Sequence, residues 1–533
     1  MPLPPGPRTT EAHGAGPLRW WQTKWGAGGI ALFCALPLIW PQIPPLVDLP
    51  GHMAAFRVEL DLAHSPLLQR YYTLHWAVIG NMGLNLLVIP LSKLFGLELS
   101  VKLSMLAVPP MTAAGFLWVS RELHGRIVPT ALFAIPLAYS YPFVFGFANF
   151  VLSTALCFPA LGLWLMLGRM GRPRLRAMLF VPVGGIVWAA HTTGWGILGI
   201  MAFSADIVRQ RESGVDWRRA GLRAAIQCLS LCLPVVLMLV WRSGDVAGTT
   251  GGFNPVTKIA YILYSLRDRW AWLDIPSILI VLALIMLAAR GRGLVFTGFT
   301  WSAALLGTVY VLLPQRIFGS SYADMRILPF AIACALLAIR PRGPAQALAA
   351  LGLLFVFVRI GAETISFALY DRAWRSELAA LDHVPRGARM ISLVGTPCRI
   401  DWRGDWMMRR LDHLPGMAVV RREAFSNDQW SVAGAQLDRA AFPAAGAFEK
   451  DPSQIVRLHD CPANRWPTLD SSLRRFPRAA FDYLWLIDPP PYDRSLVKGM
   501  VPVWTNGRST LFRILDRTQP VSRSTDTLPA AST

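Results

Sequence analysis

The sequence is poor in charged residues and lacks the short motifs of many soluble enzymes. Only 16% of its 533 residues are charged, against about 25% in an average soluble domain, which excludes a disordered chain, a coiled coil and an ordinary soluble enzyme. It contains no P-loop, no H-E-x-x-H and no G-x-S-x-G pattern. Nucleotide hydrolysis through a P-loop and zinc proteolysis therefore have no support.

Cysteine is scarce and scattered. The seven cysteines form no C-x-x-C and no zinc-type spacing, so the sequence supports no structural metal site. Five of them fall inside apolar runs, where small buried side chains are expected. Cys398 and Cys461 are the two in the polar C-terminal part, and they could form one disulfide if that part lies outside the cytoplasm.

Long apolar runs are what the sequence has in abundance. Hydrophobic residues make up 53% of the chain and gather in runs of about 15 to 22 residues that stop near residue 366. This pattern predicts a polytopic α-helical membrane protein followed by a compact polar domain. We expect a cytoplasmic N-terminal tail (1–25), a transmembrane domain (26–366, with its first outer loop at 45–99), an extracytoplasmic α+β domain (367–517) and a disordered tail (518–533).

Within the expected α+β domain the patterns are short. Residues 390–394 and 483–487 are apolar runs typical of buried strands, and 488–491 form a turn signal. Residues 370–381 have the spacing of a short amphipathic helix.

Basic residues are concentrated between the apolar runs. The formal net charge is +20, and residues 1–366 carry +15 of it. Basic short loops stay on the cytoplasmic side of a membrane, so this excess needs no nucleic-acid partner. The rule predicts about eleven crossings, a cytoplasmic N-terminus and an outer C-terminal domain. The stretches expected in the cytoplasm are 121–126, 168–176, 209–223, 290–292 and 340–342.

Two segments depart from simple crossings. Residues 77–95 would invert the charge rule if they crossed, and they contain Asn85 and Lys93, so we expect a helix at the outer membrane surface. Residues 177–207 must cross twice with helices of about 15 residues each, so their turn near His191 should lie below the membrane surface. Irregular backbone at that depth borders protein or water, which predicts a recessed outer cavity.

The first apolar run, about 26–44, is expected to cross the membrane once, and Asp48 and His52 stand just after it, four residues apart. At this place a carboxylate can act as a general base, and an imidazole can orient it. A structural alternative is that Asp48 caps the helix predicted over 51–63. On that helix Arg57 and Asp61 have the i, i+4 spacing of a surface ion pair. Glu59 is a second candidate for the catalytic carboxylate.

Arg326 lies in a later outer loop, at the mouth of an apolar run. An arginine there can bind a phosphate beside the lipid headgroups. The alternative is an arginine that pairs with Asp324 and extends to the membrane surface. Arg316, in the same loop, and His191, in the predicted cavity, are further candidates for binding a substrate.

Several short motifs accompany these residues. The stretch P-L-S-K-L-F-G at 90–96 is followed by L-S-V-K-L at 99–103 and by an apolar run that ends in R-E-L-H-G at 121–125; M-R-I-L-P stands at 325–329. With an acid just after the first apolar run, they resemble the multi-spanning glycosyltransferases of the C-type fold (GT-C), relatives of the protein mannosyltransferases and the lipid A aminoarabinose transferases.

The resemblance implies a GT-C-like enzyme of the bacterial inner membrane, with its C-terminal domain in the periplasm. It would transfer a hexose or pentose from a polyprenyl-phosphate donor to a lipid, glycan or protein acceptor. Asp48 would be the catalytic base, with His52 beside it. Arg326, with Arg57, Lys93 or Arg316, would stabilise the departing lipid phosphate, and His191 remains a further candidate for binding the substrate. No cofactor is required, and no second acid adjoins Asp48 to support a divalent metal.

Two other functions stay open on the sequence. A transporter or flippase of a lipid-linked sugar or anion would use the cavity near His191, although no internal repeat of the transporter kind is found. A non-catalytic membrane scaffold would bind a partner through its C-terminal domain.

Overall fold

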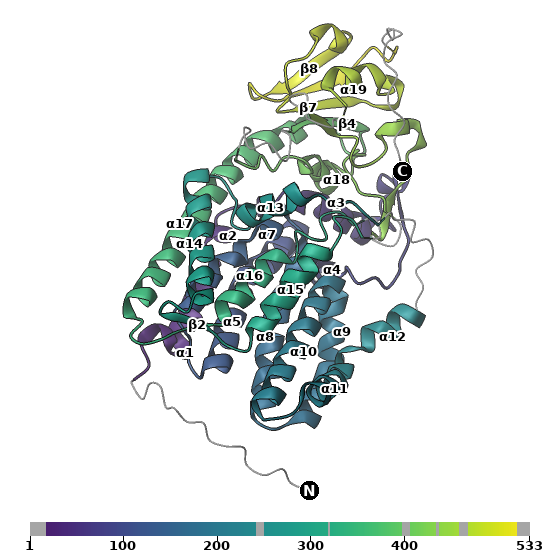
Figure 1. Cartoon of the computed structure of the whole chain (residues 1–533). Helices are drawn as coiled ribbons and strands as arrows, with labels where there is room; N and C mark the ends of the chain where they lie inside the picture. The colour runs from purple at the N-terminus through teal and green to yellow at the C-terminus, as the bar shows by residue number, and fades with distance from the viewer. Residues whose placement is uncertain are drawn as a thin grey trace.

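The computed structural model describes residues 17–240, 250–317, 320–396, 406–432, 436–457 and 467–519. Figure 1 shows an elongated helical part with a smaller sheet-containing part at one end. The sheet-containing part is C-terminal. Cys398 and Cys461 lie outside the described residues, and so does the predicted disulfide.

Helices of very different length build the larger part. They are α1 (Lys24–Phe33), α2 (Leu36–Ile39), α3 (Leu49–Asp61), α4 (Gly83–Phe95), α5 (Leu97–His124), α6 (Thr130–Ala134), α7 (Tyr141–Phe145), α8 (Ala148–Arg169), α9 (Pro173–Ala190), α10 (Thr192–Glu212), α11 (Trp217–Cys228), α12 (Leu233–Val240), α13 (Pro255–Tyr264), α14 (Ala271–Ala289), α15 (Thr300–Leu312), α16 (Leu328–Leu337) and α17 (Gln346–Leu378). Three short strands accompany them, β1 (Tyr72–Leu74), β2 (Leu294–Phe296) and β3 (Ile339–Pro341).

Four helices of the described residues are long and apolar enough to cross a membrane, namely α5, α8, α14 and α17 with the 3-10 turn that extends it. The pair α11 and α12, bent by 60°, makes a fifth if it is one span. The predicted polytopic helical architecture therefore agrees with these helices. The predicted eleven crossings are not confirmed, because helices such as α15 and α16 are short, with 13 and 10 residues.

The first apolar run, predicted as one crossing near 26–44, is broken in two. α1 ends at Phe33, and α2 begins at Leu36 with Pro37 in its first turn. Pro37 has no N–H to donate to the preceding turn, so helical hydrogen bonding cannot continue through it.

The two unusual segments follow their predictions in part. The helix expected within 77–95 is α4, whose 13 residues span about 20 Å at 1.5 Å per residue, less than the roughly 30 Å of a membrane core. The predicted turn at His191 is confirmed, because α9 ends at Ala190 and α10 begins at Thr192. These helices have 18 and 21 residues, longer than expected, because both continue into their arginine-rich ends.

The C-terminal part is built on a five-stranded mixed sheet with the order β6-β4-β7-β9-β8. β4 is parallel to β6 and β7, whereas β9 is antiparallel to β7 and β8. Its elements are β4 (Met390–Thr396), α18 (Met417–Arg422), β5 (Asp438–Ala440), β6 (Ile455–Arg457), α19 (Leu469–Arg475), β7 (Tyr483–Ile487), β8 (Met500–Thr505) and β9 (Thr510–Ile514). The two predicted strands are confirmed as β4 and β7. The separate helix predicted at 370–381 is wrong, because α17 runs unbroken to Leu378.

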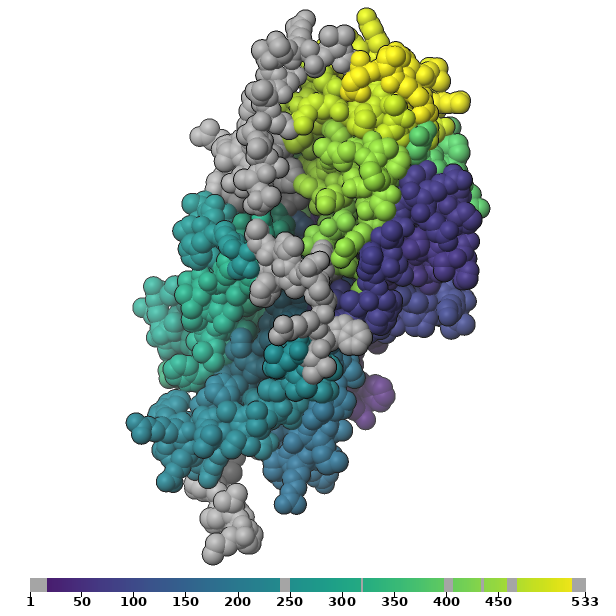
Figure 2. Space-filling view, turned by 90° about the vertical axis from the view of Figure 1, so that its right-hand side faces the viewer, coloured from purple at the N-terminus to yellow at the C-terminus, as the bar shows by residue number. Residues whose placement is uncertain are grey.

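The two parts share structure across their boundary. β1, in the first outer loop, pairs with β5 of the C-terminal part in antiparallel register, and Figure 2 shows green C-terminal residues against the blue-violet residues of that loop. Arg410 donates to the carbonyl oxygen of Pro45 at 2.7 Å and pairs with Asp268. The indole of Trp406 donates to Asp274 at 2.7 Å. Residues 406–432 are thereby anchored to the helical part.

Candidate functional site

Backbone from a distant helix holds Asp48 at the start of α3. The N–H of Asp48 donates at 2.9 Å to the carbonyl oxygen of Phe145, the last residue of α7. Gly146 follows with φ +92°, and a Cβ there would lie 2.7 Å from the Asp48 nitrogen. Glycine alone combines this positive φ with so close an approach.

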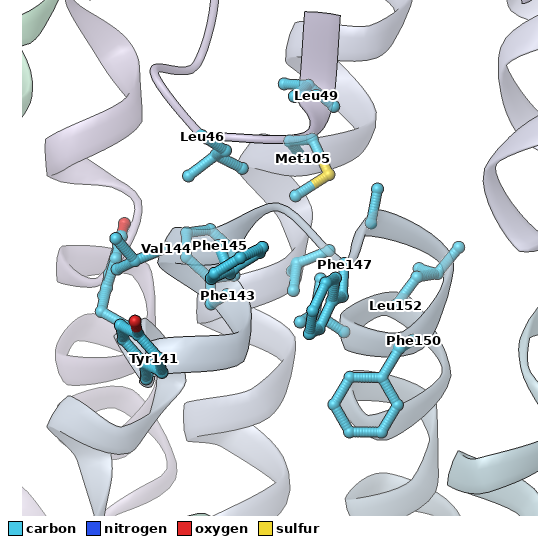
Figure 3. Close-up of a cluster of buried hydrophobic side chains, with 14 of the residues drawn as sticks. Leu46, Leu49, Met105, Tyr141, Phe143, Val144, Phe145, Phe147, Phe150 and Leu152 are labelled. Atoms are coloured by element: carbon cyan, nitrogen blue, oxygen red, sulfur yellow. The ribbon is translucent and has the colours of Figure 1, made fainter. Parts of the chain in front are cut away.

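An apolar floor lies beneath Asp48. Its neighbours Leu46 and Leu49 are fully buried, and Figure 3 shows them above Met105 and the aromatic residues of the α7 turn, among them Phe145. The carboxylate therefore stands at the edge of an apolar cluster, where water solvates it poorly.

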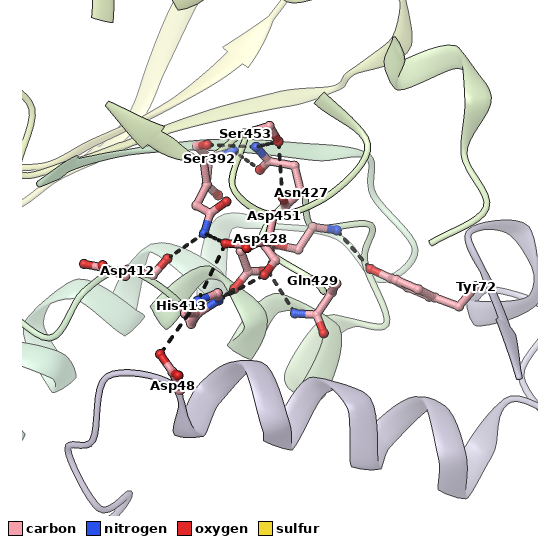
Figure 4. A network of polar contacts seen from close by, with 12 residues as sticks. Asp48, Tyr72, Ser392, Asp412, His413, Asn427, Asp428, Gln429, Asp451 and Ser453 are labelled. Carbon is pink, nitrogen blue, oxygen red and sulfur yellow. Dashed lines mark hydrogen bonds and ion pairs between the residues drawn. The ribbon is translucent and has the colours of Figure 1, made fainter. Parts of the chain in front are cut away.

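The side chain of Asp48 faces the C-terminal part. It makes no capping hydrogen bond to α3, so the capping alternative does not account for it. Its Oδ1 lies 3.9 Å from Nε2 of His413, as Figure 4 shows. An imidazole therefore does stand beside Asp48, but it comes from a segment 365 residues further along the chain.

His413 is enclosed by carboxylates. Its Nε2 lies 3.7 Å from Asp451, and its Nδ1 lies 3.0 Å from the carbonyl oxygen of Asp428. Burial lowers the pKa of His413, but the carboxylates of Asp451, Asp48, Asp428 and Asp412 outweigh it, and the net pKa is raised. The structure thus brings to the candidate base an imidazole whose surroundings favour the protonated form.

His413 was not predicted from the sequence, although a repeated tripeptide could have pointed to it. Leu-Pro-Gly occurs at 49–51 after Asp48 and again at 414–416 after His413. The two turns pack against each other: a Cβ on Gly416 would lie 2.8 Å from the carbonyl oxygen of Pro50.

His52 points to a different neighbour from the one expected. Its ring lies 5.0 Å from the ring of Trp430 and 6.3 Å from that of Phe56. Burial lowers the pKa of His52 to about 3, with smaller contributions from the charges of His413 and Arg326. His52 is therefore a neutral wall of the site.

Arg326 and His191 meet near the same place. Nη1 of Arg326 lies 3.3 Å from Nε2 of His191, and its guanidinium lies over the ring of Phe147 at 4.3 Å. Burial lowers the pKa of Arg326 to about 10, and the charge of Asp48 opposes this shift. The alternative pairing with Asp324 is wrong, because Asp324 binds Lys258 at 2.9 Å.

The remaining candidates lie elsewhere. Arg57 pairs with Asp61 at 2.8 Å, as its spacing predicted, and also with Glu423 at 3.3 Å. Lys93 and Arg316 are exposed, the first on α4 and the second in the loop before α16.

Both carboxylate oxygens of Glu59 accept from Nδ2 of Asn85, at 2.7 and 2.9 Å. Burial raises the pKa of Glu59 to about 7. This carboxylate joins α3 to α4 rather than facing Asp48.

The described residues offer no metal site. Within them no three His, Cys, Asp or Glu side chains converge closely enough to hold an ion. Nε2 of His413 stands within 4 Å of the carboxylates of both Asp48 and Asp451.

Comparison with known proteins gives a distant likeness. No protein-family model and no curated protein sequence matches the chain. Two crystal structures of ArnT from Cupriavidus metallidurans are similar, one in the apo state and one bound to undecaprenyl phosphate, each with 12% identity and a TM-score of 0.47. The matches cover 92% and 93% of this chain and 96% and 98% of those chains.

ArnT is an aminoarabinose transferase of the C-type fold, the family that the sequence motifs resemble. A TM-score below 0.5 at this identity is too low to assign an activity or site residues. The function proposed below therefore rests on the geometry of this chain.

Proposed function

We propose that the protein is a membrane glycosyltransferase, which moves a sugar from a polyprenyl-phosphate donor to a hydroxyl or amine of an acceptor. One observation carries the proposal: two hydrogen-bond donors, on Arg326 and His191, face each other at 3.3 Å, and the charge of Asp48 acts on the same arginine. The site combines what the reaction needs, an anion-binding pair and a base.

The protonation of His191 follows from its backbone contact. Its Nδ1 accepts the N–H of Thr193 at 3.0 Å, so a neutral ring carries its hydrogen on Nε2. Nε2 lies 3.3 Å from Nη1 of Arg326, and a guanidinium can only donate.

Two donors at this distance do not satisfy each other. A phosphate oxygen between them would accept a hydrogen bond from both. Nε of Arg326 is also buried without a hydrogen-bond partner in the part of the chain that the structure describes. This arginine thus has unused donors, and in those same residues it forms no ion pair with a carboxylate.

The reaction uses the base and the anion site together. The carboxylate of Asp48 takes the proton from the acceptor hydroxyl or amine. The acceptor atom bonds to the anomeric carbon of the sugar, while the bond from that carbon to the phosphate oxygen breaks. The polyprenyl phosphate leaves with the electron pair, and Arg326 and His191 stabilise its negative charge.

The proposed location of the site is the extracytoplasmic face of the bacterial inner membrane. Figure 1 shows α3, α18 and the sheet at one end of the molecule, with α11 and β2 at the other. The basic residues of α11 and those flanking β2 and β3 belong to this second end. Basic segments stay in the cytoplasm, which supports an outward-facing site and a periplasmic C-terminal domain.

A reconstituted transfer assay tests the proposal. The purified protein in lipid nanodiscs is given a radiolabelled undecaprenyl-phosphate sugar as donor and an envelope lipid extract as acceptor. Undecaprenyl phosphate is the lipid chosen because it is the ligand of one similar structure. We expect the wild type to transfer the sugar and Asp48→Asn to lose about 10²- to 10⁴-fold of that rate. Arg342→Ala, a control at the opposite end of the molecule, should keep the wild-type rate. Chelation with EDTA is expected to leave the rate unchanged.

The alternatives give different results. Full activity in Asp48→Asn would show that Asp48 is not the catalytic base. Movement of the labelled lipid across a vesicle bilayer without any transfer would indicate a flippase. No transfer and no movement, with a partner bound to the C-terminal part, would indicate a scaffold.

A further inference from the structure

We infer that His413 is a positioning residue of this site, which holds the carboxylate of Asp48 ionised and correctly placed from the C-terminal part of the chain. The inference rests on the proposed function and adds a residue to it. It means that the site is complete only when residues 406–432 are docked on α3.

Hydrogen-bond geometry determines the protonation of His413. Its Nδ1 lies 3.0 Å from the carbonyl oxygen of Asp428. A carbonyl oxygen can only accept, so Nδ1 carries a hydrogen. In a neutral ring Nε2 would then present its lone pair to Asp48 and Asp451, at 3.9 and 3.7 Å. A second proton on Nε2 replaces this repulsion with attraction, so His413 is an imidazolium.

The surroundings of His413 supply the matching charge. Facing it are the carboxylate of Asp48 from α3, those of Asp412, Asp428 and Asp451 from the C-terminal part, and the imidazole of His52. His52 is neutral because its pKa is about 3. One cation therefore stands among several carboxylates, and its removal would leave them facing one another.

Packing keeps the imidazole in place. The ring of Trp430 lies 4.4 Å from that of His413. A Cβ on Gly51 would lie 2.9 Å from the Trp430 ring and 3.3 Å from Nδ1 of His413. The start of α3 and the ring of His413 are thus in direct contact, so a shift of one displaces the other.

The role has a consequence for the pH dependence. While His413 is charged, Asp48 is stabilised as the ionised base that the reaction needs. Above the raised pKa of His413 the imidazolium loses its proton. The carboxylates of Asp48 and Asp451 then face the lone pair of an uncharged ring, and the attraction that holds Asp48 in place is lost. Transfer should therefore fall on the basic side of the pH profile as His413 deprotonates.

The test uses His413→Asn in the full-length protein. The asparagine amide can still donate to the Asp428 carbonyl oxygen, but it brings no charge to Asp48. We expect kcat to fall about 10- to 100-fold with an unchanged KM for the undecaprenyl-phosphate sugar, and the basic limb of the kcat profile to disappear. The matched control is His383→Asn, at an exposed position, which should keep both the rate and the profile of the wild type.

The outcomes separate this inference from the proposed function. If Asp48→Asn loses transfer while His413→Asn keeps the wild-type kcat and pH profile, the role of His413 is overturned and the transferase remains. If Asp48→Asn keeps full transfer, the proposed function fails first. Should His413→Asn not fold, the ¹⁵N spectrum of histidine-labelled wild type decides, with His413→Gln for assignment: a neutral His413 at pH 7 would overturn the inference.

Discussion

The two ends of α10 show opposite ways of placing an arginine in aromatic surroundings. Near its C-terminal end, Asp206 receives two hydrogen bonds from Arg176, at 2.9 and 2.7 Å, and Arg176 lies over the Trp164 ring at 4.1 Å. At its N-terminal end, His191 meets Arg326 donor to donor at 3.3 Å. The first arginine has a carboxylate acceptor within the fold, whereas the second donates among the described residues only to the carbonyl oxygen of Ser321, at 3.3 Å, and has no carboxylate partner there. A matched pair holds the fold together, and a mismatched pair marks a binding site.

Replacing each arginine in turn tests most directly whether the two have different roles. Arg176 is 1% exposed, and loss of one partner from a buried ion pair costs about 3–5 kcal/mol. Arg176→Ala should therefore lower the thermal unfolding midpoint in detergent strongly. Arg326→Ala should leave that midpoint within about 2 °C of wild type, since a stability change below about 0.5 kcal/mol shifts it little. Equal losses of stability would show that Arg326 is structural.

In ligand binding the larger effect is expected from Arg326→Ala and the smaller from Arg176→Ala, the reverse of their effects on stability. Arg326→Ala is expected to weaken the binding of undecaprenyl phosphate, measured by calorimetry in nanodiscs, by about 10- to 100-fold, because a charge-assisted hydrogen bond contributes about 1.5–3 kcal/mol. Arg176→Ala, measured below its unfolding temperature, should bind normally.

A smaller effect is expected from two glycines that both have positive φ. Gly146 has φ +92° and lies against the Asp48 nitrogen, whereas Gly125 has φ +74° with open space around it. Alanine at either place costs about 1–2 kcal/mol of backbone strain. Only Gly146→Ala should also lower the transfer rate, because it displaces Asp48 from its position. A normal rate in Gly146→Ala would mean that the exact place of Asp48 is unimportant.

A pH-dependent effect is expected at Glu59, whose partner is the neutral amide of Asn85 instead of an arginine. Burial raises the pKa of Glu59 from 4.5 to about 7, so the folded state holds its proton more tightly than the unfolded state. The stability that this group contributes is present below pH 4.5 and is lost as pH rises to about 7. Glu59→Gln should flatten the fall in stability between these values, as measured by denaturant unfolding. An unchanged slope would contradict the raised pKa.

The sequence predicted local elements well where one physical signal was strong. The apolar runs at β4 and β7, the break at His191 and the ion pair of Arg57 with Asp61 follow from hydrophobicity, helix length and residue spacing. The break at Pro37 within the first apolar run was not predicted, and the separate helix predicted at 370–381 is wrong because α17 absorbs it.

Asp48, Arg326 and His191 were singled out from the sequence because charged or polar residues beside apolar runs are costly unless they have a function. Their meeting was not predictable, since 135 residues separate His191 from Arg326.

Hydropathy and charge alone predict a helical membrane protein with a polar C-terminal part, because burial in lipid requires long apolar runs and basic loops leave an uneven charge pattern. Which imidazole stands beside Asp48 depends instead on how distant segments pack. His52 is close in the sequence but turns to Trp430, whereas His413 is brought to the carboxylate by the packing of two Leu-Pro-Gly turns. Contacts between distant segments depend on how whole surfaces pack, and no local pattern of residues encodes that.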